Sequence, residues 1–417
     1  MICTWPTNYK LKLESKLIYH AIGNGLFSSG KILIKNLGSN ENIKEFNYIY
    51  DCGTNNSKEI LEKRIDEYNK SNKKNLDLLT ISHFDKDHIN GLEKLLNGRR
   101  VKRIILPYLD PRQRFTLALK YFSHVKKISY MIFDPTSFFE NYADEIIYVT
   151  DTKYDSKQTQ VFNDNDNSIR IIGEEIDKSL LAEDLVTMPS KVRVFSKLEM
   201  KYNDLVKFKF YNRSIEDYEL TDFYFKVDAV LKKFSLKLDK KIFYNKMAME
   251  EIKKIYKALP YGINNSSICM SVISCEEVGN LKNTNIKCIK SKLLGINCHS
   301  KACIQRFGYM FTGDLRLKDV GKYKIFNDFV EYYSNERDFI TIFTLPHHGS
   351  KYNWNKDILN KFENADMIIT ARGNAIHPSS EVLRDLSLSS RHNTTVNHIS
   401  NKEISNEVLY YSVPSSK

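Results

Sequence analysis

Residues 83–88 contain four side chains that can bind a metal ion: His83, Asp85, Asp87 and His88. Imidazole nitrogens and carboxylate oxygens together suit a divalent cation. Side chains that alternate along an extended loop can point to one side of it, so this spacing lets them share an ion. A polar, Asp-rich loop before a helix is also often a simple turn, in which Asp87 would only cap the helix that follows.

This loop lies between a predicted strand and a predicted helix. Residues 76–81 form a short, mostly apolar run of strand length, and residues 89–96 have apolar side chains at helical spacing. Loops that leave the carboxyl end of a buried strand hold the chemistry of many α/β folds, because the strand fixes the loop while the sheet edge stays open to solvent. The four side chains are therefore well placed to form a site.

Three later strings have the same form, an apolar strand that ends in a polar group. Residues 306–314 end in Thr-Gly-Asp, residues 338–350 in His-His-Gly-Ser, and residues 367–378 in His-Pro. Each strand would deliver its polar group to the sheet edge that holds the first loop. The further candidate site residues are Asp314, His347, His348 and His377. A lone histidine is usually an ordinary core or surface residue, but here whole strings recur in order.

The loop resembles the metal-binding motif of the metallo-β-lactamase superfamily, whose common form is His-x-His-x-Asp-His, with Asp85 in place of the second histidine. This variant, followed by Ile-Asn-Gly-Leu, is similar to the hydrolase domain of the ComEC competence proteins. The later strings follow in the order of the family. ComEC-like domains also have an Asn-Asn-x-Ser string, matched here by Asn264, Asn265 and Ser267. Many other members place a metal-binding histidine near this point, and this chain has none there.

The resemblance implies an α/β protein with the metallo-β-lactamase fold, an αββα four-layer sandwich of two mixed sheets faced by helices. Residues 1–110 would form the first half of this fold and residues 260–417 the second half. The similarity fades between them, so residues 111–259 would be an α+β insertion that can select the substrate. Within it, residues 208–213 and 223–226 interleave aromatic and basic side chains. Such stretches can stack nucleic-acid bases, but they are more often exposed edge strands with a buried apolar face.

The resemblance also implies two divalent metal ions, zinc or manganese. By this resemblance, one ion would be held by His83, Asp85 and His347, the other by Asp87 and His88, and Asp314 would bridge them. Two cations about 4 Å apart lower the pKa of a shared water, so hydroxide can form at neutral pH and attack phosphorus.

Catalytic roles are expected for Asp87, His348 and His377, and either of these histidines would bind the phosphate or protonate the leaving oxygen. Asp85 replaces an imidazole with a harder ligand. We therefore expect manganese to support activity at least as well as zinc.

Two further motifs lie near the start of the chain. Residues 25–31 spell the Gly-x-x-x-x-Gly-Lys part of a phosphate-binding loop, but Ile32 follows where a hydroxyl residue is needed, and the chain continues as a strand. We therefore predict a β-hairpin here. Asp51, in Tyr-Asp-Cys-Gly, resembles the end of the family's second strand. It would orient a metal-binding histidine or serve as an ordinary turn residue.

Length, charge and cysteine content narrow the class of protein. With 417 residues, 42% of them hydrophobic, the chain can bury a sizeable core. The formal net charge of +12 favours a polyanionic partner such as DNA, although an AT-rich coding sequence would also enrich lysine. The seven cysteines are odd in number and form no Cys-x-x-Cys pair, which indicates a reduced, cytoplasmic compartment. No apolar stretch is long enough to span a bilayer, so no membrane partner is expected.

The resemblance, together with the net charge, implies a metal-dependent hydrolase, foremost a phosphodiesterase or nuclease that acts on DNA. The free-standing proteins that this motif variant resembles also occur in bacterial self-defence systems, which extends the prediction to anti-phage defence and to protein partners in a multi-component system. Two alternatives remain open. The chain could hydrolyse a small molecule, namely a cyclic nucleotide, a lactone or a thioester, or it could be a module that retains the metal without turnover. The sequence does not indicate an oligomeric state.

Overall fold

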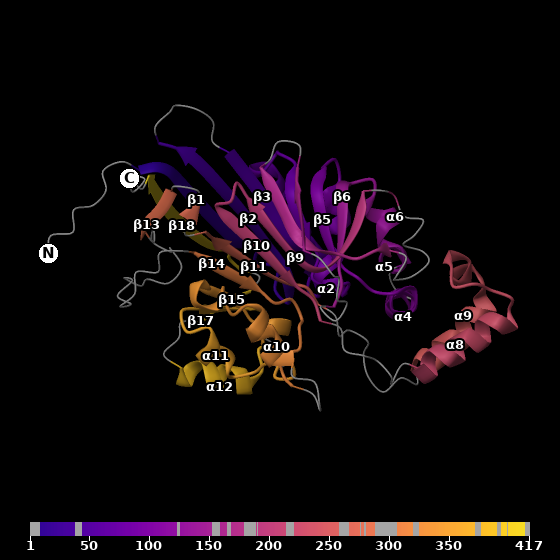
Figure 1. Ribbon diagram of the computed structural model, residues 1–417. Coiled ribbons are helices and arrows are strands. Elements are labelled where there is room, and N and C mark those ends of the chain that lie inside the picture. The colour runs from indigo at the N-terminus through magenta and orange to yellow at the C-terminus, as the bar shows by residue number, and fades with distance from the viewer. Residues whose placement is uncertain are drawn as a thin grey trace.

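The computed structural model of this protein shows strands in the middle of the molecule and helices on either side (Figure 1). The described residues are 9–37, 44–122, 126–151, 159–164, 168–178, 189, 191–213, 221–257, 267–275, 277–278, 281–287, 307–319, 325–371, 377–389, 393–397 and 399–412. The residues of the sequence analysis that lie outside them include Asn264, Asn265, Cys3, Cys288, Cys298 and Cys303. Among the described residues, no helix is long and apolar enough to cross a membrane.

The first sheet begins with antiparallel strands and continues with parallel ones. Its antiparallel part is formed by β1 (Tyr9–Tyr19), β2 (Gly25–Asn36) and β3 (Lys44–Thr54). Parallel to β3 follow β4 (Leu76–Thr80), β5 (Val101–Pro107) and β6 (Ala143–Val149). At the other edge, β1 pairs with β18 (Lys402–Ser412), β18 with β13 (Leu281–Lys287), and β13 with β12 (Glu277–Val278). Residues 25–31 lie within β2, which confirms the predicted hairpin.

The second sheet has the same organisation. Its antiparallel strands are β7 (Gln160–Asn163), β8 (Ile169–Glu175), β9 (Val192–Tyr202), β10 (Val206–Tyr211), β11 (Cys269–Ser274) and β14 (Gly308–Phe311). Parallel to β14 follow β15 (Ile342–Thr344), β16 (Asp366–Thr370) and β17 (Asn393–Val396). The start of β9 also pairs with β6, so this strand joins the two sheets.

Helices cover the outer face of each sheet. The first sheet is covered by α1 (Lys58–Ser71), α2 (Lys86–Ile89), α3 (Leu92–Leu96), α4 (Pro111–Phe122), α5 (Lys126–Phe133) and α6 (Pro135–Phe139). The second is covered by α10 (Ile325–Tyr332), η4 (Arg337–Phe339), η5 (Pro346–Gly349), α11 (Ile358–Lys361) and α12 (Ser380–Leu388). Beyond α4 and α5 lie α8 (Thr221–Lys233), η3 (Lys240–Tyr244) and α9 (Lys246–Lys257), at one end of the molecule (Figure 1).

Three apolar cores hold these layers together. The middle core packs the two sheets face to face, with the Tyr50 and Phe311 rings stacked 4.9 Å apart and the Phe46 and Phe208 rings 5.2 Å apart. One outer core packs helices on the first sheet, and the other packs α10 to α12 on the second. Burial of one such large side chain contributes about 1.5–3 kcal/mol. The predicted αββα four-layer sandwich is confirmed.

The segment 111–259, predicted as an insertion, divides into two parts. Its strands β6, β9 and β10 belong to the sheets, whereas residues 221–257 form a helical hairpin outside them. The prediction of an exposed edge strand or a base-stacking surface at residues 208–213 was wrong. β10 lies between β9 and β11, and Phe208 and Phe210 are fully buried between the sheets.

Candidate metal centre

The candidate side chains come from the ends of parallel strands in both sheets. In the first sheet, the loop after β4 carries residues 83–88. In the second sheet, β14, β15 and β16 are followed by Asp314, by His347 and His348, and by His377. Carboxyl ends of parallel strands meet at one edge of a sheet, and the two packed sheets bring both edges together. Groups far apart in the sequence therefore meet at one place.

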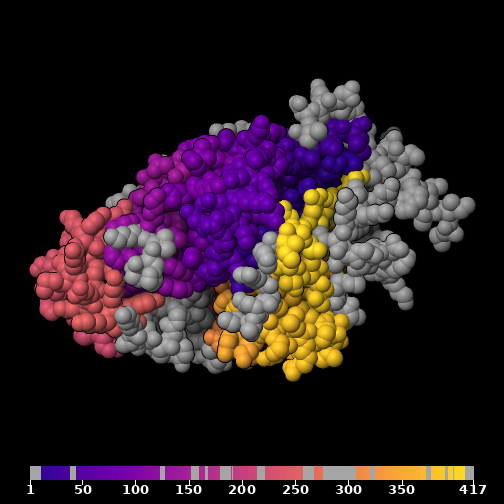
Figure 2. Space-filling model, turned by 180° about the vertical axis from the view of Figure 1, so that it is seen from behind, coloured from indigo at the N-terminus to yellow at the C-terminus, as the bar shows by residue number. Residues whose placement is uncertain are grey.

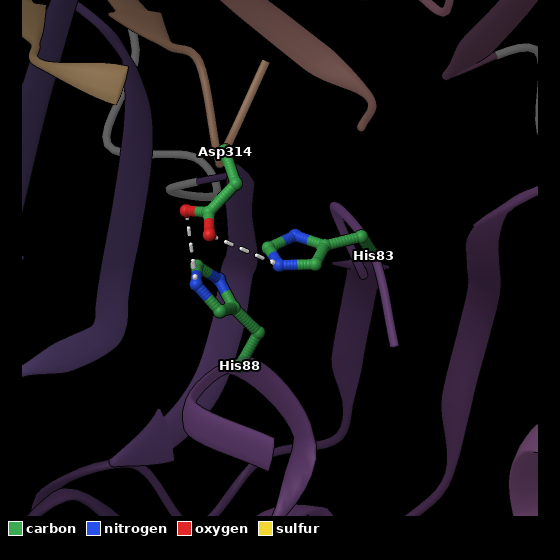
Figure 3. Close-up of side chains that lie close together, drawn as sticks. All are labelled: His83, His88 and Asp314. Atoms are coloured by element: carbon green, nitrogen blue, oxygen red, sulfur yellow. Dashed lines mark ion pairs between the residues drawn. The ribbon is translucent and has the colours of Figure 1, made fainter. Parts of the chain in front are cut away.

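The first tight group consists of His83, His88 and Asp314, whose side chains point toward one another (Figure 3). The carboxylate of Asp314 lies between the two imidazoles, with Oδ2 3.4 Å from His83 Nε2 and Oδ1 3.3 Å from His88 Nε2. The His83 and His88 ring centres are 4.0 Å apart. One carboxylate thus faces two histidine nitrogens, which is an arrangement suited to a bridging ligand.

The second tight group consists of Asp87, His88 and His348. His348 Nε2 lies 3.2 Å from Asp87 Oδ2, and His348 Nδ1 is 3.1 Å from Thr370 Oγ1. In each group, the possible ligand atoms all lie within 4.8 Å of one another. All three residues of this second group are buried.

Three atoms at the centre are buried and have no hydrogen-bond partner: His83 Nε2, His88 Nε2 and Asp314 Oδ1. Leaving such a group unsatisfied costs about 1–3 kcal/mol, so native structures rarely bury several of them side by side. A divalent cation would satisfy all three atoms at once, because imidazole nitrogen and carboxylate oxygen are its usual ligands. The donor set therefore fits a metal ion.

Asp51 and Ser82 hold the histidines of this centre in place. Asp51 Oδ2 lies 2.8 Å from His88 Nδ1 and accepts a 2.6 Å hydrogen bond from Ser82 Oγ, while its Oδ1 accepts a 2.7 Å bond from Ser82 N. Asp51 is fully buried and has a φ of +58°, which few residues other than glycine adopt. With Nδ1 of His88 engaged in this way, Nε2 is the nitrogen left to face a cation.

Asp314 is positioned through its backbone. Its N–H donates to Ser267 Oγ at 3.0 Å, and its carbonyl oxygen accepts a 2.7 Å bond from Asn353 Nδ2. Gly313 has a φ of +52°, and a Cβ atom there would lie 2.3 Å from Ser267 Oγ. The Thr-Gly-Asp string therefore needs glycine at this position for Asp314 to reach the centre.

Asp85 stands outside the two tight groups. Its Oδ2 is 4.0 Å from His83 Nε2, while its Oδ1 accepts a 2.8 Å bond from Lys120 Nζ and a 2.7 Å bond from Tyr121 OH, both on α4. Burial raises the pKa of Asp85, but the Lys120 ammonium outweighs it and holds this pKa below its usual value. Asp85 is the N-cap residue of α2 but makes no capping bond with its side chain, and Asp87 lies inside that helix. The capping explanation of Asp87 does not hold.

His347 and His377 lie at the rim of the centre. His347 Nε2 is 3.7 Å from Asp314 Oδ2, its Nδ1 is 3.0 Å from Asn353 Oδ1, and 41% of its side chain is exposed. The His377 ring centre is 5.2 Å from that of His347 and 6.4 Å from that of His348. His347 and His348 both have positive φ angles, which place two consecutive imidazoles at the site. Such strain costs about 1–3 kcal/mol per residue and clusters at functional sites.

The carboxylates of the two tight groups are held in their ionised state. Burial raises the pKa of Asp314, but His83 and His88 outweigh it, so the pKa lies well below its usual value. Burial likewise raises the pKa of Asp87, and the hydrogen bond with His348 brings it well below the usual value. Burial lowers the pKa of His377, as do the neighbouring imidazoles. The carboxylates are thus ionised at neutral pH, the form that binds cations.

All of the predicted site residues lie in one region, and the structure adds several supporting side chains that the sequence analysis missed. They are Ser82, Lys120, Tyr121, Asn353 and Thr370. Lys120 and Tyr121 belong to an ordinary amphipathic helix, and nothing in their spacing from the loop indicates contact with Asp85. Asn353 follows the His-His-Gly-Ser string by a few residues, which was the only available signal.

Comparisons with known proteins bear on the family of this chain. Residues 42–162 match the family model of the Metallo-beta-lactamase superfamily. A crystal structure of a long form of RNase Z from yeast is similar to this chain, with a TM-score of 0.36 and 12% sequence identity, over 98% of this chain and 43% of that one. The chain thus spans less than half the length of that protein. The comparison with curated proteins gives no match. This chain therefore has the metallo-beta-lactamase fold, and residues 42–162 are similar to that superfamily.

Proposed function

We propose that this chain is a metal-dependent phosphodiesterase that acts as a nuclease on DNA. The observation that carries the proposal is the Asp314 carboxylate between two buried imidazoles whose Nε2 atoms have no hydrogen-bond partner. Such a donor set is built for divalent cations, and two neighbouring sets of this kind suit an in-line displacement at phosphorus. The net charge of +12 supports a polyanionic substrate.

We assign two metal positions. His83 would hold the first ion, with Asp85 and His347 as its further ligands, and Asp314 would bridge to the second. Asp87 and His88 would hold the second ion, and we add His348 to them because its Nε2 lies beside Asp87 Oδ2. Bound cations lower the pKa of water and offset negative charge on phosphoryl oxygens.

The remaining roles belong to residues around the metal positions. Asp51 and Ser82 would keep His88 in one orientation and one tautomer, and Asn353 would do the same for His347. His377, half-buried at the rim, would donate a hydrogen bond to the phosphate or to the leaving oxygen. With His348 assigned to the metal, His377 becomes the favoured candidate for this step.

Three carboxylates, those of Asp85, Asp87 and Asp314, contribute to the proposed ligand set beside four imidazoles. Hard oxygen ligands suit manganese better than a set of imidazoles would. We therefore propose that manganese supports activity at least as well as zinc. Metal-stripped protein that regains activity with zinc alone would contradict this assignment.

The biological setting is proposed on narrower grounds. The cysteine pattern supports a cytoplasmic location, and the likeness of the loop to free-standing proteins of bacterial self-defence systems supports a role in anti-phage defence. In that setting the chain would act with protein partners.

The decisive experiment compares purified protein with an Asp87→Asn variant, each stripped of metal and reloaded with manganese, zinc or magnesium. The substrates are plasmid DNA, linear DNA and bis-p-nitrophenyl phosphate, with a cyclic nucleotide, a lactone and a thioester in parallel. We expect cleavage of the phosphodiesters by the unaltered protein only. Turnover confined to the small molecules would replace the proposal with a small-molecule hydrolase. Bound metal by elemental analysis without any turnover would indicate a module that retains metal without catalysis.

A further inference from the structure

Residues 221–257, which we call the basic hairpin, form α8, η3 and α9 outside the two sheets. They contain ten lysines and five acidic residues, so the hairpin is strongly positive. Three of the lysines, Lys226, Lys233 and Lys240, pair with carboxylates. Within the described part of the chain, five others are exposed and form no ion pair: Lys232, Lys237, Lys241, Lys246 and Lys254. These five ammonium groups are available to an anionic partner.

The same hairpin exposes large apolar side chains. Phe225 and Tyr244 are each 74% exposed, and Met247 is 67% exposed. The Tyr244 ring stacks on that of Tyr130, with ring centres 6.5 Å apart, but neither exposed ring belongs to the apolar side of the hairpin, which other residues form. Phe243, for example, packs against Phe115, with ring centres 5.7 Å apart. Exposed aromatic rings beside free lysines therefore call for a partner outside the chain.

The basic hairpin lies beside the metal centre. α9 packs on α4, the helix that carries Lys120 and Tyr121. Burial raises the pKa of the Tyr256 hydroxyl on α9, and the charges of Lys120 and Asp85 act on the same group. Lys120 in turn bonds to Asp85, whose other oxygen faces His83. Figure 2 shows the hairpin (salmon) at one end of the molecule, against the segment that contains α4 to α6.

We propose that the basic hairpin binds a single-stranded nucleic acid and leads it toward the metal centre. Its free lysines would contact the phosphates, and the Phe225 and Tyr244 rings would stack on bases. The exposed rings favour a single strand over a duplex. Bases in a duplex are already stacked on one another, whereas unpaired bases stack readily on aromatic side chains. An acidic protein would use the lysines but leave the rings without a role. This inference rests on the proposed function, since it names the form of nucleic acid that the site would receive.

Fluorescence anisotropy with a labelled oligothymidylate of roughly 20 nucleotides tests the proposal, since this length exceeds the usual site size of single-strand binders. Titrations in the presence of a chelator prevent cleavage, and salt is varied between about 50 and 200 mM. The first variant carries Lys237→Glu, Lys241→Glu and Lys246→Glu. Each lost phosphate contact lowers the salt slope for a single strand by about 0.7, so we expect a slope smaller by about 2 and binding about 100-fold weaker near 100 mM salt.

A matched control variant reverses the charge of three lysines outside the hairpin. Lys63, Lys70 and Lys73 are exposed, lie on or just after α1, and form no ion pair within the described residues. Their replacement by glutamate changes the net charge equally, and we expect nearly unaltered affinity. An equal loss of affinity in both triple variants would overturn the proposal, because it would show that only the overall charge matters. Thermal unfolding shows whether the glutamate variant of the hairpin is folded. If it is not, glutamine at the same three positions removes the positive charges without adding negative ones.

The rings are tested separately, by Phe225→Ala and Tyr244→Ala. We expect about tenfold weaker binding of oligothymidylate for each variant, with the salt slope unaltered, because stacking involves no charge. Leu388→Ala is the control, since this leucine is 80% exposed on α12. Unaltered affinity of both ring variants would overturn the proposal, as would equal affinity of the unaltered protein for the matching duplex, or displacement of the oligonucleotide by polyglutamate.

The proposed function and the role of the hairpin are tested by separate experiments, so one can be wrong without the other. If the unaltered protein does not hydrolyse bis-p-nitrophenyl phosphate with any metal, the proposed function is wrong. The binding results still decide the role of the hairpin, because they are obtained without metal.

Discussion

The metal centre and the basic hairpin hold their charged groups in opposite ways. At the centre, carboxylates and imidazoles are buried and fixed by partners such as Asp51 and Asn353. On the hairpin, most lysines and the Phe225 and Tyr244 rings are exposed to solvent. Buried groups are costly unless they are matched at short range, so their positions are specific. Exposed ammonium groups cost little and act on any nearby polyanion.

This difference separates chemistry from binding. A reaction at phosphorus needs ligands placed to a fraction of an ångström, which strand ends from two packed sheets can provide. Attraction of a nucleic acid needs charge and stacking surface, which a helical hairpin can provide at lower precision. We therefore expect changes at the two places to have separable effects.

The largest effect is expected from Asp87→Asn. This change replaces an anionic ligand with a neutral amide beside His348, so phosphodiester hydrolysis should fall by at least about 1,000-fold. Oligothymidylate binding by the hairpin should stay within about twofold of the unaltered protein, since the change leaves the lysines and rings of the hairpin unaltered. Initial rates with bis-p-nitrophenyl phosphate and anisotropy titrations measure the two effects. Asp66→Asn, an exposed change on α1, is the control, and parallel loss of rate and affinity in Asp87→Asn would remove the separation.

The next largest effect is the increase in thermal stability that we expect when the protein binds metal. A ligand that binds only the folded state at about 100 times its Kd adds roughly 2.7 kcal/mol, which corresponds to a rise in Tm of about 2 °C or more. Manganese or zinc should therefore raise the Tm of the unaltered protein, and Asp314→Asn should abolish the rise. The triple glutamate variant of the hairpin should keep it in full. Differential scanning fluorimetry with and without a chelator gives the comparison, and an equal rise in Asp314→Asn would place the metal elsewhere.

A smaller effect is expected from Asp51→Asn. Loss of a carboxylate that orients a metal-binding histidine lowers metal affinity by about 10- to 100-fold. Competition with a metal-sensitive dye measures this affinity directly, without reference to turnover. Thermal unfolding of the metal-free variant serves as its control, since Asp51 also accepts two bonds from Ser82. Unaltered metal affinity would show that the Asp51 contact serves the fold alone.

The smallest effect concerns pH and stability, and it involves a buried histidine outside the centre. Burial lowers the pKa of His20 to about 3, and its Nε2 lies 2.8 Å from Ser29 Oγ. Because this pKa is depressed in the folded state, the stability from His20 is complete above about pH 6.5 and is lost as pH falls toward 3. The slope should approach about 1.4 kcal/mol per pH unit.

Urea unfolding at several pH values checks this slope, with His20→Gln as the comparison. The glutamine variant should lose less stability than the unaltered protein between pH 6.5 and 5. Binding of oligothymidylate should stay almost constant over this range, because the hairpin contains no histidine and its lysines remain charged. A steep loss of binding below pH 6.5 in folded protein would contradict the role given to the lysines.

Prediction from the sequence succeeded where local patterns decide the structure. The strand before residues 83–88 and the helix α3 after them follow from the spacing of apolar residues. Prediction failed at β10. Its alternation of lysine and aromatic residues is typical of an exposed edge strand, but Lys207 and Lys209 both pair with Glu336, which is almost fully buried. A distant carboxylate thus allows an inner strand to carry lysines.

The sequence alone determined the types of candidate ligand, their order along the chain and the strands that carry them, because these depend on neighbouring residues. Only the tertiary structure decided that the Asp314 carboxylate lies between His83 and His88, that Asp85 is held by Lys120 and Tyr121, and that Phe225 stays in solvent while Phe223 is buried. Contacts between distant residues depend on how the sheets and helices pack together. No spacing within one segment contains that information.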